Sequence, residues 1–143
     1  TNIGLGASGS GNIPTFNAAS NVTGNTISGT IDVEVQLGDC PAVQDQFVVN
    51  VLSAPDFDYT TTPQNGLDCI TGIGVINGVV NPVNSSASWS GPGVVSGGNT
   101  FTPVINQPGQ YTVILNDNVN GCSSTYSVTI EPPTLINITT VNI

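Results

Sequence analysis

The chain has 143 residues and contains no lysine, arginine or histidine, whereas nine aspartate and glutamate residues give it a net charge of −9. The missing side chains supply most general bases, phosphate clamps and imidazole metal ligands, so the composition argues against an enzyme and indicates no catalytic residues. An acidic surface repels phosphate groups and no apolar run is long enough to span a membrane, so we expect neither nucleic-acid binding nor membrane insertion.

Apolar and polar residues alternate in short segments that are separated by turn residues. The first segment, 26–37, has apolar residues and a glycine on one face and polar residues on the other, which predicts a half-buried strand. The same period of two recurs in later segments, and no segment has the period of an amphipathic helix. Asn77-Gly78 and Asn120-Gly121 have the composition of tight hairpin turns. The sequence therefore predicts an all-β fold of antiparallel β-sandwiches.

The pattern of the chain repeats after about 80 residues. A Gly-Asn pair, an aromatic residue, a strand, a cysteine and a second strand follow one another from Gly11 to Ala54 and again from Gly98 to Pro133. The matching cysteines, Cys40 and Cys122, are 122 − 40 = 82 residues apart. A period of this length corresponds to one sandwich domain for each repeat.

The register of this repeat divides the chain into three parts. Residues 1–54 match the C-terminal part of a repeat, residues 55–133 form a complete repeat, and residues 134–143 match the first strand of a following repeat. We interpret the chain as tandem sandwiches. The chain is either a segment of a longer array or a unit whose incomplete sandwiches are completed by neighbouring copies.

The cysteines suggest a disulfide within the complete repeat. Cys69 falls on a predicted early strand and Cys122 near the last strand, with Trp89 between them, which is the arrangement of an inter-sheet disulfide. Cys40 matches Cys122, so its partner would precede Thr1. The alternative is three free thiols in a reducing compartment.

Two aromatic residues are predicted core anchors. Trp89 lies where a sandwich fills its core, and Tyr111 follows Pro108-Gly109 in the manner of a tyrosine corner. These positions favour core roles over a platform on which sugars stack.

The carboxylates have no cationic side chain to pair with, which makes cation binding a candidate role. Asp56 and Asp58 directly follow Ala54-Pro55, and Asp117 lies in a turn before Cys122. Calcium takes oxygen ligands, so these three aspartates are candidate calcium ligands at a joint between repeats. The alternative is that Asp56 and Asp58 are exposed strand residues. No other cofactor is indicated.

Several motifs resemble those of a known family. The segment Ile3 to Phe16, with its Gly-Asn-Ile-Pro-Thr-Phe run, resembles the PKD-like, Ig-like repeats of very large surface adhesins of Bacteroidota. The motifs Trp89-Ser-Gly-Pro-Gly93 and Pro108-Gly-Gln-Tyr-Thr-Val113 are similar to another repeat type of the same proteins. The resemblance implies an extracellular, cell-surface location, export by the type IX secretion system, and association with gliding-motility or secretion machinery through other regions.

We therefore expect a non-enzymatic stalk or spacer of a secreted, multi-repeat adhesin, whose partners are the neighbouring Ig-like repeats. Two other functions stay open. One is a self-assembling extracellular filament in which residues 134–143 of one copy complete residues 1–54 of the next by adding a strand. The other is a carbohydrate-binding module.

Overall fold

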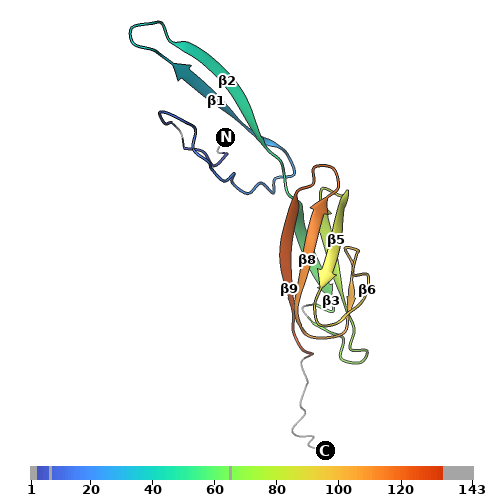
Figure 1. Cartoon of the computed structure of the whole chain (residues 1–143). Coiled ribbons are helices and arrows are strands. Elements are labelled where there is room, and N and C mark those ends of the chain that lie inside the picture. Colours follow the sequence, from blue (N-terminus) through green and yellow to red (C-terminus); the bar gives the residue numbers. More distant parts are fainter. Residues whose placement is uncertain (1–2, 7, 65, 134–143) are drawn as a thin grey trace, which may run out of the picture. The chain divides into compact units, whose positions relative to one another are not determined.

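The computed structural model describes residues 3–6, 8–64 and 66–133. Over these residues it contains nine strands, paired almost entirely antiparallel, and no helix, which confirms the all-β prediction (Figure 1). The chain divides into two compact units, Thr1–Ala54 (unit 1) and Pro55–Ile143 (unit 2). This division coincides with the predicted boundary after residue 54. The predicted strand at 134–143 lies outside the described residues.

Unit 1 contains a single long hairpin formed by β1 (Ile27–Val35) and β2 (Val43–Val51). The two strands pair antiparallel, with Ile31 opposite Phe47, and they form a two-stranded sheet. The predicted alternation is present, because the apolar residues of β1 all lie on one face of the hairpin. The described part of the segment before β1 contains no strand.

A buried asparagine fastens the base of this hairpin. The Nδ2 group of Asn21 donates to the carbonyl oxygens of Val51 (2.9 Å) and Asn25 (2.8 Å). The carbonyl oxygen of Asn21 accepts from the backbone N–H of Ala54 (2.8 Å). Asn21 is only 3% exposed, so these bonds satisfy a polar side chain that would be costly to bury alone.

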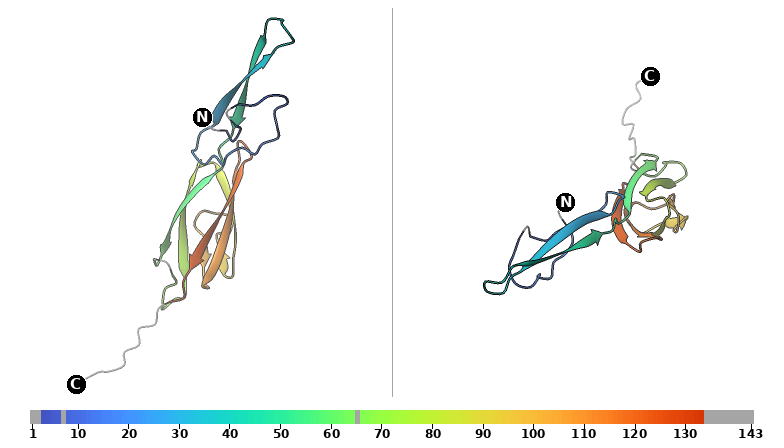
Figure 2. Two further views of the ribbon diagram at one scale, coloured as in Figure 1. Left: turned by 90° about the vertical axis from the view of Figure 1, so that its left-hand side faces the viewer. Right: turned by 90° about the horizontal axis from the view of Figure 1, so that it is seen from above.

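Unit 2 is a β-sandwich built from two sheets. The four-stranded sheet has the order β3-β4-β7-β6 and the three-stranded sheet the order β5-β8-β9. The views in Figures 1 and 2 show these sheets as the two layers of the unit. The strands are β3 (Asp56–Thr62), β4 (Gly74–Asn81), β5 (Ser85–Ser90), β6 (Val94–Ser96), β7 (Val104–Ile105), β8 (Gly109–Asp117) and β9 (Ser123–Ile130).

The hydrophobic core of unit 2 lies between these sheets and draws on both. Strand β8 shows how alternation builds it: Tyr111, Val113 and Leu115 are fully buried, whereas Ile114 is 47% exposed on the other face. The remaining buried members are Phe57, Leu67, Ile76, Val80, Ala87, Trp89, Ile105, Val128 and Ile130. This core stabilises unit 2 by removing apolar surface from water.

One predicted turn is correct and one is wrong. Asn120-Gly121 forms the β8–β9 turn, where Gly121 has a φ of +75° that favours glycine. Asn77-Gly78, in contrast, lies inside β4. Gly78 is needed there for space, because a Cβ at this position would lie 2.4 Å from Cε2 of Phe57. The glycine therefore marks a close approach of the backbone to the core and not a reversal of the chain.

Candidate functional site

The first and last strands of unit 2 contact each other at the start of β3. The carbonyl oxygen of Pro55 accepts a hydrogen bond from Oγ of Ser124 on β9 (2.6 Å). The hydroxyl oxygen of Tyr126 lies 3.3 Å from the same carbonyl oxygen and 3.0 Å from Oδ1 of Asp56, so its single proton is shared between two acceptors. We call this group of side chains the terminal-strand contact.

The electrostatics of the terminal-strand contact follow from its partial burial. Burial raises the pKa of Tyr126, and the hydrogen bond and negative charge of Asp56 raise it further. Both effects favour the neutral phenol, which can donate. Tyr126 therefore remains a hydrogen-bond donor throughout the physiological pH range. The ring of Tyr126 also packs against Phe57, with centroids 5.7 Å apart.

The same two segments meet again at the other end of unit 2. Gly66, just beyond β3, forms an isolated parallel bridge with Glu131, just beyond β9. Since Pro55 meets Ser124 at one end and Gly66 meets Glu131 at the other, β3 and β9 run in the same direction, although they belong to different sheets. The described part of unit 2 thus begins at one end of the sandwich and finishes at the opposite end (Figure 1).

Trp89 and Tyr111 both lie in the core, as the sequence predicts. The indole Nε1 of Trp89 donates to the carbonyl oxygen of Thr100 (2.9 Å), and its ring meets Phe57 edge to face, with centroids 5.8 Å apart. The hydroxyl of Tyr111 donates to the carbonyl oxygen of Gln107, four residues upstream (2.7 Å). Burial raises the pKa of Tyr111. Neither ring offers a face on which a sugar could stack.

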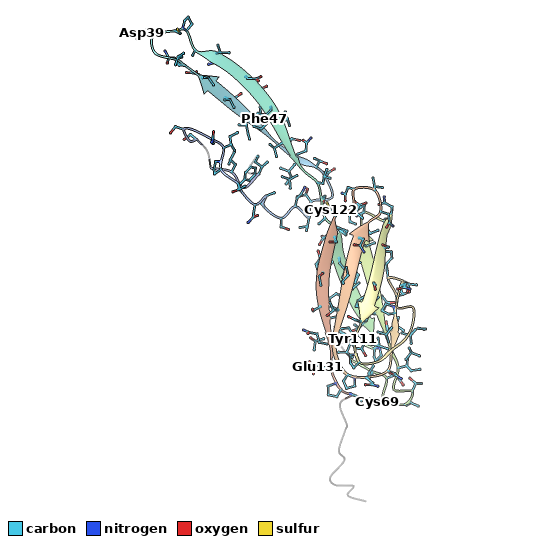
Figure 3. The ribbon with its side chains drawn as sticks, viewed as in Figure 1. Asp39, Phe47, Cys69, Tyr111, Cys122 and Glu131 are labelled. Atoms are coloured by element: carbon cyan, nitrogen blue, oxygen red, sulfur yellow. The ribbon has the colours of Figure 1, made fainter. Side chains whose placement is uncertain are left out.

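The predicted disulfide between Cys69 and Cys122 is not formed, and all three cysteines are free. Figure 3 shows Cys69 and Cys122 at opposite ends of unit 2. The eight residues of β9 alone span about 26 Å, at about 3.3 Å per residue, whereas a disulfide requires Cα atoms within about 7 Å. Bridging them would require unfolding the sandwich, so this prediction is wrong for the folded unit.

The error arose because Cys69 is not on a strand. It lies in a turn after β3, where Oδ1 of Asp68 accepts from the backbone N–H groups of Ile70 (2.9 Å) and Thr71 (2.7 Å). These hydrogen bonds, with Thr71 contributing most, lower the pKa of Asp68. Cys122 closes the opposite turn, where its carbonyl oxygen accepts from the N–H of Asp117 (2.8 Å). Cysteines in two turns at opposite ends of a sandwich cannot form a disulfide with each other.

The three candidate calcium ligands all lie in unit 2 but have separate roles there. Asp117 is 5% exposed, and its Oδ1 accepts from the N–H of Val119 (2.8 Å) inside the β8–β9 turn. Asp56 belongs to the terminal-strand contact, and Asp58 is exposed on β3 opposite Val79. Across the described residues, no group of three or more histidine, cysteine or acidic side chains is placed to hold a metal ion. Calcium binding by these residues stays a prediction.

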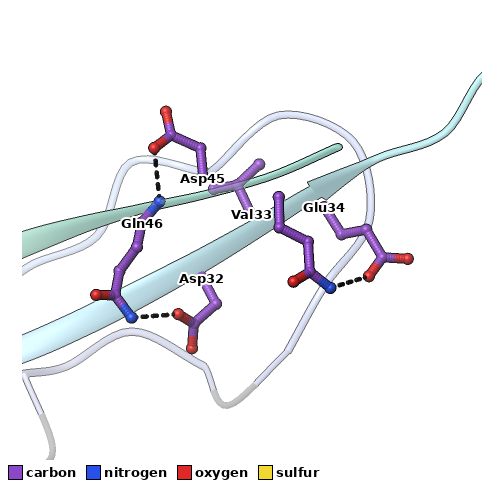
Figure 4. A pocket seen from close by; sticks show the side chains of 6 residues that line it. Asp32, Val33, Glu34, Asp45 and Gln46 are labelled. Atoms are coloured by element: carbon purple, nitrogen blue, oxygen red, sulfur yellow. Dashed lines mark hydrogen bonds between the residues drawn. The ribbon is translucent and has the colours of Figure 1, made fainter. Parts of the chain in front are cut away.

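Carboxylates on unit 1 are paired with amide side chains, which the sequence analysis missed. Across the hairpin, Nε2 of Gln46 donates to Oδ1 of Asp32 (2.7 Å) and Nε2 of Gln44 donates to Oε2 of Glu34 (2.8 Å), as Figure 4 shows. Asp32 lies directly opposite Gln46, and Glu34 opposite Gln44, in the strand register. The signal was present as an acid-rich strand followed by a glutamine-rich strand, but it becomes readable only once the register is known.

Comparisons of the chain with known protein families, curated proteins and solved structures give no match. Within the part of the chain that the structure describes, no helix has the length and apolar character needed to cross a membrane.

Proposed function

We propose that the chain is a non-enzymatic stalk or spacer segment of a secreted, multi-repeat bacterial adhesin. The observation that carries this proposal is that β3 and β9 run in the same direction, so that the described part of unit 2 starts and finishes at opposite ends of the sandwich. A module with this arrangement can be placed in series with others and lengthens an array by the long dimension of its sandwich.

The arrangement also determines how unit 2 responds to force. Tension applied through its two ends pulls β3 and β9 in opposite directions along their own axes. The contacts between them, from Ser124 at one end to Glu131 at the other, are then stressed together and not one after another. Because the hydrogen bonds of Ser124 and Tyr126 and the Gly66–Glu131 bridge are loaded together and not peeled from one end, the arrangement suits a segment under tension.

The composition supports the same function. The chain contains no lysine or arginine, so proteases of trypsin specificity have no bond to cleave. The resemblance to repeats of Bacteroidota surface adhesins supports an extracellular, cell-surface location and neighbouring Ig-like repeats as partners. Contact with motility or secretion machinery would then be made by other regions of such a protein.

Single-molecule stretching of the full chain, held at its two ends, tests this proposal. We expect Tyr126→Phe to unfold unit 2 about fivefold faster at a given force, since a net hydrogen bond contributes about 1 kcal/mol and 1.4 kcal/mol corresponds to tenfold. Tyr59→Phe, which removes the hydroxyl of an exposed tyrosine on β3, is the matched control and should unfold at the original rate. Equal rates for both variants, or unfolding of unit 2 at forces too low to measure, would contradict the proposal.

Calcium at Asp56, Asp58 and Asp117 would add stiffness to such an array. Thermal unfolding of the full chain with calcium and with a chelator tests this separately. A midpoint that rises with calcium, and no longer rises in Asp56→Asn, supports the site, whereas an unchanged midpoint contradicts it.

A self-assembling filament is the second candidate function, because β1 and β2 form a two-stranded sheet whose outer edges carry no further strand among the described residues. Free edges can accept an incoming strand. Electron microscopy of the purified chain distinguishes the two functions, since ordered fibres favour assembly and dispersed particles favour a stalk. The carbohydrate-binding alternative has less support, because Trp89 and Tyr111 are buried.

A further inference from the structure

The hairpin of unit 1 repeats the inward-facing pattern of the hairpin β8–β9 in unit 2. Ile31 lies opposite Phe47 in unit 1, and Val113 lies opposite Tyr126 in unit 2. Counting along the strands from these pairs, each residue on the apolar face of β1 and β2 has a counterpart on the core-facing side of β8 and β9. In this count Cys122 corresponds to Val43, and Cys40 lies three residues earlier, in the longer loop of unit 1.

The two hairpins differ in what covers this face. In unit 2, Leu115 and Val128 are fully buried beneath the four-stranded sheet. In unit 1 their counterparts Val33 and Val49 are half-buried, and Phe47, the counterpart of Tyr126, is 42% exposed. The same kind of apolar surface is therefore fully covered in unit 2 and only partly covered in unit 1, and an isolated two-stranded hairpin is at best marginally stable in water.

We infer that the open face of β1–β2 is the inner face of a second sandwich, and that it is covered by a β-layer of the kind that β3, β4 and β5 form in unit 2. This inference rests on the proposed function, in which units of one kind follow one another. In unit 2, β3 contacts β9 and β5 pairs with β8. The covering layer would therefore contact β2 through its first strand and extend the sheet at the free edge of β1 through its last.

The place where this layer joins unit 1 is visible in the sequence. Ile3-Gly-Leu-Gly6 matches Ser90-Gly-Pro-Gly93, which begins with the last residue of β5. Gly91 is packed against the ring of Tyr111, where a Cβ would lie 2.3 Å from Cδ1. The counterpart of Tyr111 in unit 1 is Gly29, and the side chain of Ile3 fills the space beside it. In this match Ile3 takes the place of Ser90, the last residue of β5, so a β5-like strand would lead into Ile3.

The covering layer must also differ chemically from that of unit 2. Ser124 and Tyr126 donate hydrogen bonds to the carbonyl oxygen of Pro55, but their counterparts are Asp45 and Phe47. An aspartate carboxylate accepts and cannot donate, and phenylalanine has no hydroxyl. The first strand of the covering layer therefore presents a donor, such as a hydroxyl, an amide or a backbone N–H, opposite Asp45.

Grafting the layer of unit 2 onto the full chain tests both parts of this inference. A copy of residues 53–89 is fused directly before Ile3, with and without the paired substitutions Asp45→Ser and Phe47→Tyr, which restore the donors of unit 2. Hydrogen exchange of the β1–β2 amides is then compared with the chain that carries the same substitutions but no graft. We expect exchange to slow at least tenfold in the grafted, substituted chain and by less in the grafted chain that keeps Asp45 and Phe47.

The matched control carries Ile76→Asp in the grafted copy only, which places a charge in its core face and should remove the protection. Unchanged β1–β2 exchange in both grafted chains would overturn the inference. The inference would also be overturned if the β1–β2 amides of the ungrafted chain were already protected. Light scattering would show whether a dimer protects them, and deletion of residues 134–143 would show whether that segment does. Each result leaves the stretching behaviour of unit 2 unaffected, so this inference and the proposed function can fail separately.

Discussion

At the scale of single residues, the structure shows how a chain without cationic side chains satisfies its polar groups. Carboxylates accept from glutamine amides on unit 1 and from backbone N–H groups in the turns of unit 2. Buried polar residues such as Asn21 and Tyr111 hydrogen-bond to backbone carbonyls. In the described part of the chain, every buried side-chain nitrogen and oxygen has a partner. Hydrogen bonds therefore take the place that ion pairs have in other proteins.

The hydroxyl of Tyr111 is the clearest single contribution of this kind. Tyr111→Phe removes a part-buried hydrogen bond to the carbonyl oxygen of Gln107, so we expect the free energy of unfolding to fall by about 1 kcal/mol. Urea unfolding followed by the fluorescence of Trp89 measures this loss. Tyr59→Phe, at an exposed position, should change the midpoint little, and a loss of equal size in both variants would contradict the assignment.

The raised pKa values of Tyr111 and Tyr126 predict a loss of stability in base. Burial is the first cause for both, and it favours the protonated phenol in the folded state. Below the ordinary tyrosine pKa of 10.0 both states keep the proton and stability is independent of it. As pH rises from 10 through the raised folded-state pKa, the unfolded chain releases protons first, so stability falls. Urea unfolding midpoints measured between pH 8 and pH 11.5 should fall as pH rises above 10, and they should fall less steeply with pH in Tyr111→Phe.

At the scale of secondary-structure elements, alternation along a strand decides which side chains hold unit 2 together. Strand β8 has consecutive residues with opposite environments, because its inner face meets the four-stranded sheet and its outer face does not. Alternation of this kind was readable in the sequence and predicted the strand. The partners of β8, namely β5 on one side and β9 on the other, were not readable because pairing depends on distant segments.

A pair of neighbouring substitutions on β8 tests the two faces. Leu115→Ala removes a fully buried side chain and should destabilise unit 2 by about 2–5 kcal/mol, through lost burial and the cavity left behind. Ile114→Ala acts on the outer face and should change stability by about 0.5 kcal/mol or less. Chemical unfolding of both variants gives the comparison, and similar losses would mean that the strand is rotated relative to the structure.

At the scale of the whole molecule, the two units bury their apolar faces to different extents. Unit 2 buries its apolar face between two sheets, whereas unit 1 leaves a comparable face largely open. The cysteines lie in turns at the ends of their units and not across a core. Any covalent cross-link made by these thiols would therefore join separate units or chains, and would not staple the sandwich of unit 2.

Thiol chemistry tests this placement. A disulfide between Cys69 and Cys122 would close a loop of 122 − 69 = 53 residues and would contribute about 4 kcal/mol on the chain-entropy account. With the cysteines at opposite ends of unit 2, we expect three titratable thiols without reductant, and the same unfolding midpoint with and without it. Cys69→Ser with Cys122→Ser should leave the midpoint unchanged. A mass two hydrogens lower, together with a midpoint that falls on reduction, would contradict the structure.

Composition and periodicity were sufficient to predict the all-β class, the boundary after Ala54, and the core positions of Trp89 and Tyr111. These features can be read along the chain, from turn residues, from alternation, from the repeat of about 80 residues and from the motif around Tyr111. The tertiary structure decided what depends on segments far apart in the chain. It separated Cys69 from Cys122, placed Gly78 beneath Phe57 inside a strand, and brought Pro55 to Ser124 and Tyr126. Sequence alone could not give these results, because strand register and sheet order arise from packing between distant residues, and a pattern along one strand does not specify its partner.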